Sequence, residues 1–181
     1  MVGDYLLAKG LLLSVNNEDH RLLKIVSEAV QQMSEGELLQ LEKARKLDID
    51  EAVYFEVIRK KTASLIASCC ACGAASAGAT EEEIERMRLF GEKIGIAFQV
   101  ADDLLDVASD ETASGKTPGT DLKEGIPTLV TLSVIAENDP ADKELISRLV
   151  KPINDEDLSQ VIQELRTHKV MEKVKAYLGK I

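Results

Sequence analysis

The chain has 181 residues, of which 45% are hydrophobic, and a formal net charge of -10 at pH 7. This length suits one domain, so we expect residues 1–181 to form a single domain around a buried core. An acidic chain without a basic stripe is not expected to bind nucleic acid, and no apolar run is long enough for a membrane span. No basic segment follows Met1, so we expect no signal peptide. We interpret Cys69, Cys70 and Cys72 as reduced thiols, which fit a cytoplasmic protein.

The composition predicts an all-α fold, because the chain lacks Trp, has only four Pro and is rich in residues that favour helices. Polar side chains that can act as N-caps precede several of the predicted helices, and Thr80 and Glu83 have the spacing of a capping box. The other expected caps are Asp19, Asp50 and Asn154. In chain order we expect helices over residues 3–15, 19–46, 51–77, 81–108, 126–137, 140–150 and 155–167, then a final segment that reaches Leu178.

Two segments need separate comment. Residues 34–37, Ser-Glu-Gly-Glu, either interrupt the second predicted helix or only loosen it. Residues 109–125 are rich in Gly, Ser, Thr and Asp and form a long predicted loop, and ordered loops of this length are often functional lids.

An acidic patch lies near the end of the predicted helix over residues 81–108. At about 100° of rotation per residue, Asp102, Asp103 and Asp106 share one arc of that helix, and Gln99 points into the same arc one turn earlier. Apolar residues border the arc on both sides, which predicts a helix that is buried nearly all round. These flanking residues are Phe90, Ile94, Phe98, Ala101 and Leu105 on one side and Leu89, Ile96, Val100, Leu104 and Val107 on the other.

Carboxylates that face a protein interior repel one another and lose hydration unless a cation compensates them. Carboxylate oxygens are ligands that suit Mg²⁺, so we interpret Asp102, Asp103 and Asp106 as candidate metal ligands. The alternative is an ordinary solvated acidic face, which the apolar flanks disfavour.

Basic residues elsewhere fit an anionic substrate. Lys60 and Lys61 lie in mid-helix, about 100° apart, so at least one of them should point to solvent. Lys116 lies in the Gly-containing loop and is free to reach an anion. Ammonium groups beside a metal held by carboxylates are what a diphosphate requires.

The run FQVADDLLD at residues 98–106, with GKTPGTDLKEGIPTL at residues 115–129, resembles the second aspartate-rich motif and following loop of the trans-isoprenyl diphosphate synthases, the polyprenyl synthetase family. Three other segments resemble family segments in the same order: VGDYLLAKG at 2–10, SEGELLQL at 34–41 and RKKTASL at 59–65. Together they extend the resemblance over most of residues 1–135.

The resemblance implies an isoprenoid-synthase-type helical bundle and a prenyltransferase that condenses an allylic diphosphate with isopentenyl diphosphate, using Mg²⁺. It implies that Asp102 and Asp106 ligate the metal, and that Asp103 ligates it or holds its water. It also implies roles for residues outside the acidic patch: Lys61 and Lys116 bind the allylic diphosphate, Thr62 and Gln99 line the region of the carbocation, and Gln40 lies near the metal or the carbocation.

The sequence also departs from the family pattern. DDLLD at 102–106 is the only DDxxD motif in the chain, and Ile126 stands where members often have Lys. We therefore expect a partial bundle that is shortened at the N-terminus and that stops near Leu178, where some members continue, with little or no prenyl transfer activity on its own. Bare apolar helix faces should favour a homodimer, and a heteromer is possible.

Alternative functions stay open at this stage. One is a non-catalytic subunit of a heteromeric prenyl diphosphate synthase, another is a terpene cyclase, and the least favoured is a helical protein without a ligand. Asn138-Asp139 and Asn154-Asp155 do not continue into the second metal motif of terpene cyclases. The segment EGELLQL at residues 35–41 weakly favours a product of medium or long chain.

Overall fold

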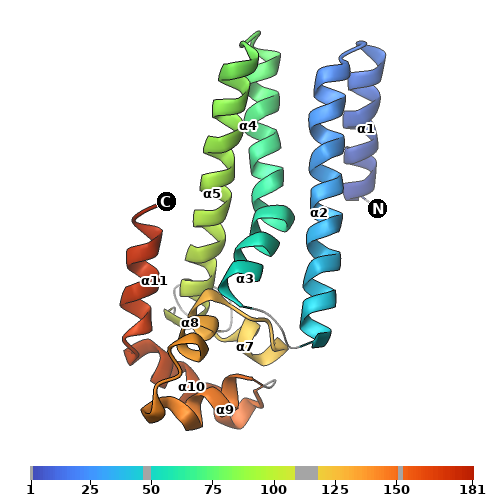
Figure 1. Cartoon of the computed structure of the whole chain (residues 1–181). Coiled ribbons are helices and arrows are strands. Elements are labelled where there is room, and N and C mark those ends of the chain that lie inside the picture. The colour runs from blue at the N-terminus through green and yellow to red at the C-terminus, as the bar shows by residue number, and fades with distance from the viewer. Residues whose placement is uncertain (1, 47–49, 109–117, 151–152) are drawn as a thin grey trace. The chain divides into compact units, whose positions relative to one another are not determined.

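The computed structural model describes residues 2–46, 50–108, 118–150 and 153–181. These residues form helices and turns without a strand, which confirms the all-α prediction for the described part of the chain (Figure 1). None of the helices in these ranges is long and apolar enough to cross a membrane. In chain order the elements are α1 (Val2–Asn16), α2 (His20–Lys46), α3 (Glu51–Ile58), a π-helical turn η1 (Arg59–Ala63), α4 (Ser64–Ser76), α5 (Glu81–Ala108), α7 (Thr120–Glu124), α8 (Leu129–Glu137), a 3-10 turn η2 (Pro140–Asp142), α9 (Lys143–Leu149), α10 (Asp155–Thr167) and α11 (Val170–Leu178).

Side-chain caps form at four helix starts where the sequence predicts them. Asp19 Oδ1 accepts from the Leu22 amide at 3.0 Å, and Asp50 Oδ1 accepts from the Val53 amide at 2.8 Å. The Thr80 amide donates to Glu83 at 2.8 Å, and the Glu83 amide donates back to Thr80 Oγ1 at 3.3 Å. The Asn154 side chain caps α10 in the same way, by accepting from the Asp157 amide at 2.8 Å.

The structure corrects two boundaries. The helix expected from residue 126 begins at Leu129 instead, because Thr128 and Thr131 form a capping box and Thr128 adopts an extended conformation. The described end of the predicted loop over residues 109–125 contains the short helix α7, which begins directly after Gly119. Gly119 has φ +76°, a left-handed conformation that favours glycine.

The chain divides into two compact units, each described here by itself. The first comprises residues 1–42 and 57–96, and the second comprises residues 43–56 and 97–181. The expectation of a single domain over residues 1–181 stays a prediction.

In the first unit, small residues let α4 and α5 pack closely. A Cβ atom added at Gly91 would lie 2.8 Å from Ala67 Cα, and one added at Gly95 would lie 2.5 Å from Ala63 Cα. Ala71, Ala75 and Ile84 form a buried cluster beside these contacts, against which Leu22 and Ile25 of α2 pack.

Helix α2 runs unbroken through residues 34–37, so this segment does not interrupt it. Gly36 is buried at the place where η1 approaches α2, and a Cβ atom there would lie 2.8 Å from the Lys61 backbone nitrogen. The glycine of the acidic segment is therefore explained by close helix packing.

In the second unit, α8 is the central element, since six of its residues from Leu129 to Val134 are buried. Helix α10 is joined to the end of α5 by Arg166, whose Nε donates to the Val107 carbonyl at 2.8 Å. Tyr177 of α11 stacks on Phe55 of α3, with ring centroids 5.0 Å apart. Other buried core residues of this unit include Val100, Val107, Val161, Leu165, Val170 and Val174.

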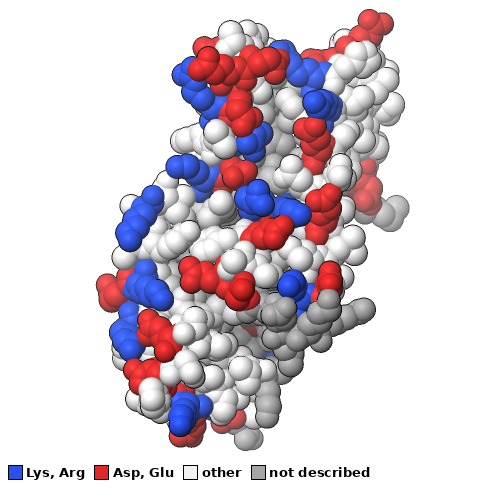
Figure 2. Space-filling model, viewed as in Figure 1, with Lys and Arg blue, Asp and Glu red and all other residues white. Residues whose placement is uncertain are grey.

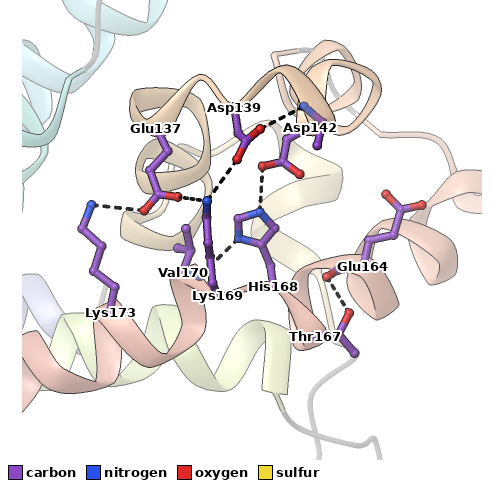
Figure 3. Close-up of polar contacts among 10 residues, drawn as sticks. Glu137, Asp139, Asp142, Glu164, Thr167, His168, Lys169, Val170 and Lys173 are labelled. Carbon is purple, nitrogen blue, oxygen red and sulfur yellow. Dashed lines mark hydrogen bonds and ion pairs between the residues drawn. The ribbon is translucent and has the colours of Figure 1, made fainter.

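Ion pairs connect α8, η2 and the start of α11 in the same unit (Figure 3). Lys169 Nζ lies 3.3 Å from Glu137 Oε2 and 3.1 Å from Asp139 Oδ2. The Val170 amide donates to His168 Nδ1, so the ring proton lies on Nε2 and is donated to Asp142 Oδ2 at 3.0 Å. These contacts fix the C-terminal helices to α8.

Helix α5 is not buried nearly all round, and this part of the sequence prediction is wrong. On one flank Phe90 is 54% exposed, Phe98 60% and Leu105 56%. On the other flank Val100, Leu104 and Val107 are buried, whereas Leu89 is 43% exposed. The reason is that the described neighbours cover only part of the helix surface, whereas periodicity predicts only that both flanks are apolar.

Candidate functional site

The acidic patch lies on the last turns of α5, within the second unit. Asp103 is buried at 2% exposure, and its Oδ2 accepts hydrogen bonds from the Tyr54 hydroxyl at 2.7 Å and the Leu129 amide at 2.8 Å. Gln99 Nε2 donates to the Oδ1 atom of Asp103 at 3.3 Å. The predicted partners Gln99 and Asp103 are thus brought together, and Asp103 links three elements of the unit.

The carboxylate of Asp106 binds backbone amides at the beginning of α7. Its Oδ1 accepts from the Thr120 amide at 3.1 Å, and its Oδ2 accepts from the Asp121 amide at 3.3 Å. The Asp106 carbonyl accepts from the Gly119 amide at 2.9 Å. The described part of the predicted loop therefore folds back onto the acidic patch and adds Asp121 to it.

Burial and mutual repulsion perturb the carboxylates of the patch. Burial, reinforced by the charges of Asp106, Asp103 and Asp102, raises the pKa of Asp121 to about 6. Burial also raises the pKa of Asp103 and of Asp106 above the ordinary value, although the hydrogen bonds that each accepts oppose the change. Burial raises the pKa of Tyr54 far above its usual range, so its hydroxyl stays protonated and donates. A cation bound at the patch would relieve this repulsion.

The donor set fits a hard divalent cation in its chemistry, because every candidate ligand atom is a carboxylate oxygen. In the ranges that the structure describes, no three His, Cys, Asp or Glu side chains are grouped closely enough to hold a metal ion by themselves. Mg²⁺ is commonly held by one or two carboxylates together with phosphate oxygens and water, which agrees with this arrangement. Asp102 and Asp106, both half-buried, are the residues best placed to serve as these carboxylates.

The first unit brings together two other predicted residues. Lys61 Nζ donates to Gln40 Oε1 at 3.0 Å, and the preceding Lys60 donates to Glu35 Oε2 at 3.3 Å. Lys61 is exposed, which confirms that at least one of the two lysines faces solvent. Thr62 is half-buried in η1, the π-helical turn that also carries both lysines.

Lys116 lies outside the described residues. The structure adds two residues that the sequence analysis did not select, Tyr54 and Asp121. Tyr54 had a weak signal, since it shares the apolar face of α3 with Val57 and Ile58, but that spacing alone indicates a core aromatic residue. Asp121 lies within the segment GKTPGTDLKEGIPTL, which resembles the family, but nothing in its spacing shows that it joins the acidic patch.

A hollow of about 530 Å³, away from the acidic patch, is lined by η2, α9, α10 and the start of α11. Several of its polar groups pair with one another: Arg148 binds Glu164, Lys169 binds Asp139, and the His168 ring donates a hydrogen bond to Asp142. On the face seen in Figure 2, Lys and Arg are likewise interleaved with Asp and Glu. The acidic patch on α5 is therefore the better candidate site.

Comparison with known proteins gives a consistent picture. Residues 1–166 match the family model for polyprenyl synthetase. The chain is 35% identical over 164 residues to an octaprenyl diphosphate synthase from Escherichia coli, covering 91% of this chain and 51% of the relative. It is 35% identical over 135 residues to heptaprenyl diphosphate synthase component 2 from Geobacillus stearothermophilus, covering 75% of this chain and 42% of the relative.

Solved structures agree. A crystal structure of a polyprenyl synthase from Caulobacter crescentus, complexed with calcium and isoprenyl diphosphate, superposes with a TM-score of 0.88 at 32% identity. The match covers 99% of this chain and 55% of that one, so the isoprenoid-synthase-type bundle is confirmed as the fold. The chain spans about half the length of the curated relatives it matches. The family match over residues 1–166 and the shared fold establish that the chain belongs to the polyprenyl synthetase family.

Proposed function

We propose that the chain carries one half of the active site of a Mg²⁺-dependent trans-prenyltransferase, which condenses an allylic diphosphate with isopentenyl diphosphate. The observation that carries this proposal is the pair of half-buried carboxylates, Asp102 and Asp106, at the end of α5 in a chain that belongs to the polyprenyl synthetase family. The relative crystallised with calcium and isoprenyl diphosphate supports a divalent cation and a diphosphate as ligands.

Each residue of the candidate site has a proposed task. Asp102 and Asp106 hold Mg²⁺, with Asp103 behind them, and Gln99 and Thr62 direct oxygen atoms at developing positive charge. A metal held by Asp102 and Asp106 would supply positive charge that neutralises a diphosphate leaving group. Lys61 and Lys116 bind the remaining phosphate oxygens, and Gln40 orients Lys61 through the hydrogen bond described above.

The activity of residues 1–181 alone is a separate question. Ionising an allylic diphosphate requires charge neutralisation on both sides of the leaving group, and this sequence contains one DDxxD motif. We therefore expect this polypeptide to show little or no prenyl transfer, and incorporation of isopentenyl diphosphate by it would contradict that expectation. The product of the complete enzyme is proposed to be of medium or long chain, as the name of the E. coli relative suggests.

The protein is proposed to act in the cytoplasm. It is also proposed to form a homodimer, because large apolar side chains such as Phe90 and Phe98 are exposed. A monomer in light scattering would contradict the dimer. The second candidate function is a subunit of a heteromeric synthase, favoured by the similarity to a relative named as component 2 of such an enzyme. Restoration of activity by an added partner subunit would favour this candidate.

Metal binding tests the proposal directly. Isothermal titration of the chain with Mg²⁺ and inorganic diphosphate should give saturable binding that Asp102→Asn weakens at least tenfold. Asp4→Asn makes the same chemical change on the exposed face of α1 and should leave the affinity unchanged. Equal affinities of the wild type and Asp102→Asn would overturn the assignment of the site.

A further inference from the structure

Tyr54 makes a buried contact with the acidic patch to which no role has yet been given. The Tyr54 residue is 5% exposed, and its hydroxyl donates to Asp103 Oδ2 at 2.7 Å. The two residues lie 49 positions apart in the chain, on α3 and α5. A hydrogen bond from a protonated hydroxyl to a buried carboxylate is among the stronger ones in proteins.

Asp103 connects α3, α5 and α8 through hydrogen bonds. Its Oδ2 takes two donors, the Tyr54 hydroxyl of α3 and the Leu129 amide at the first turn of α8. Its Oδ1 takes the Gln99 amide group from the preceding turn of α5. A carboxylate with both oxygens occupied in this way is poorly suited to bind a metal, and well suited to fix the rotation of the helix turn that carries it.

We propose that Tyr54 is a positioning residue for the metal site: its hydroxyl holds Asp103, and Asp103 in turn fixes the direction of Asp102 and Asp106. This inference rests on the proposed function, in which Asp102 and Asp106 hold the metal. It assigns Asp103 a mainly structural task within the DDxxD motif and extends the site to α3.

The contribution of the Tyr54 hydroxyl can be measured separately from that of the ring. Phenylalanine at position 54 keeps the ring, which packs edge-on against Phe55 with centroids 5.2 Å apart, and removes only the donor. Tyr5→Phe makes the same chemical change on the exposed face of α1 and serves as the matched control. Any effect that is specific to Tyr54→Phe therefore belongs to the bond with Asp103.

The first test needs no metal. In EDTA, Tyr54→Phe should raise the unfolding constant about tenfold, as expected for loss of a buried hydrogen bond to a charged group. In the double variant with Asp103→Asn, the unfolding constant should rise by clearly less than the product of the two increases seen in the single variants. The amide resonances of Thr120 and Asp121, which report on Asp106, should shift in Tyr54→Phe and not in Tyr5→Phe.

The second test is the affinity for Mg²⁺ with inorganic diphosphate, which Tyr54→Phe should weaken about tenfold and Tyr5→Phe should not. Unchanged stability, or unshifted Thr120 and Asp121 amides, would overturn the positioning role. Reduced stability with unchanged metal affinity would also overturn it. Failure of the proposed function has a different signature, namely a wild type that binds no metal, and in that case the amide shifts and the stability cycle still decide whether Tyr54 positions the turn.

Discussion

Asp121→Asn should stabilise the metal-free protein in a pH-dependent way. The carboxyl of Asp121 has a pKa of about 6 in the folded protein, against an ordinary value of 3.8. Below pH 3.8 the group is protonated in both states and contributes nothing to the pH dependence. Between these two values the folded protein keeps a proton that the unfolded chain releases, so stability falls as the pH rises. Above pH 6 the Asp121 carboxyl is charged in the folded protein too, so the destabilisation caused by its burial has reached its full size. Asparagine at this position removes that destabilisation.

The size of the effect follows from the same values. The difference between about 6 and 3.8 corresponds to about 3 kcal/mol, because each pH unit is worth about 1.36 kcal/mol. Asp121 is only half-buried, so solvent screens much of this penalty. We therefore expect Asp121→Asn to raise the free energy of unfolding by about 1 kcal/mol at pH 7 to 8, and by close to zero at pH 4.

Urea denaturation in EDTA at a series of pH values measures this difference. Asp4→Asn removes an exposed carboxylate from α1 and should show no comparable step in stability near pH 6. Mg²⁺ with diphosphate should reduce the gain from Asp121→Asn, because the bound cation compensates the carboxylate in the wild type. A gain of equal size at pH 4 and pH 8 would refute the electrostatic explanation.

Other substitutions test the packing and capping described above. Gly95→Ala should destabilise the protein by about 1–3 kcal/mol, because a Cβ atom would lie 2.5 Å from Ala63 Cα, whereas Gly73→Ala, with nothing within 4 Å, should stabilise it by about 0.5–1 kcal/mol. Equal effects of the two in thermal denaturation would contradict the close contact. Asn154→Ala should cost about 1 kcal/mol through loss of the α10 cap, and unchanged chemical denaturation would count against that cap. Arg166→Gln should cost about 1–2 kcal/mol and speed hydrogen exchange at the end of α5, and unaltered exchange there would argue against the role of its bond to Val107.

Local signals in the sequence predict most of the helices. Asp19, Asp50 and Thr80 act within three residues of themselves, so their capping roles can be recognised from spacing alone. The start of α8 was misplaced because Pro127 gives a helix-start signal, and the capping box of Thr128 overrides it.

The acidic patch was predictable only in part. Helical spacing places the three aspartates on one arc, but it does not reveal which hydrogen-bond donors lie 15, 26 or 49 residues away. Only the structure therefore reveals that Tyr54 and the Leu129 amide donate to Asp103. Periodicity likewise predicts that both flanks of α5 are apolar, and cannot predict that the flank of Phe98 is exposed.

The π-helical turn η1 is the place where this segment can most easily change length. The turn holds one residue more than regular α-helical winding would, and it absorbs that residue locally. Deleting one residue within Arg59–Ala63 would therefore restore regular winding and leave the residues on either side of the turn on nearly the same helix faces. The cost would fall on the close contacts made by the turn itself, which are those of Lys61 with Gly36 and of Ala63 with Gly95. A one-residue deletion in the regular turns of α4 should be more disruptive, because it would rotate one side by about 100°.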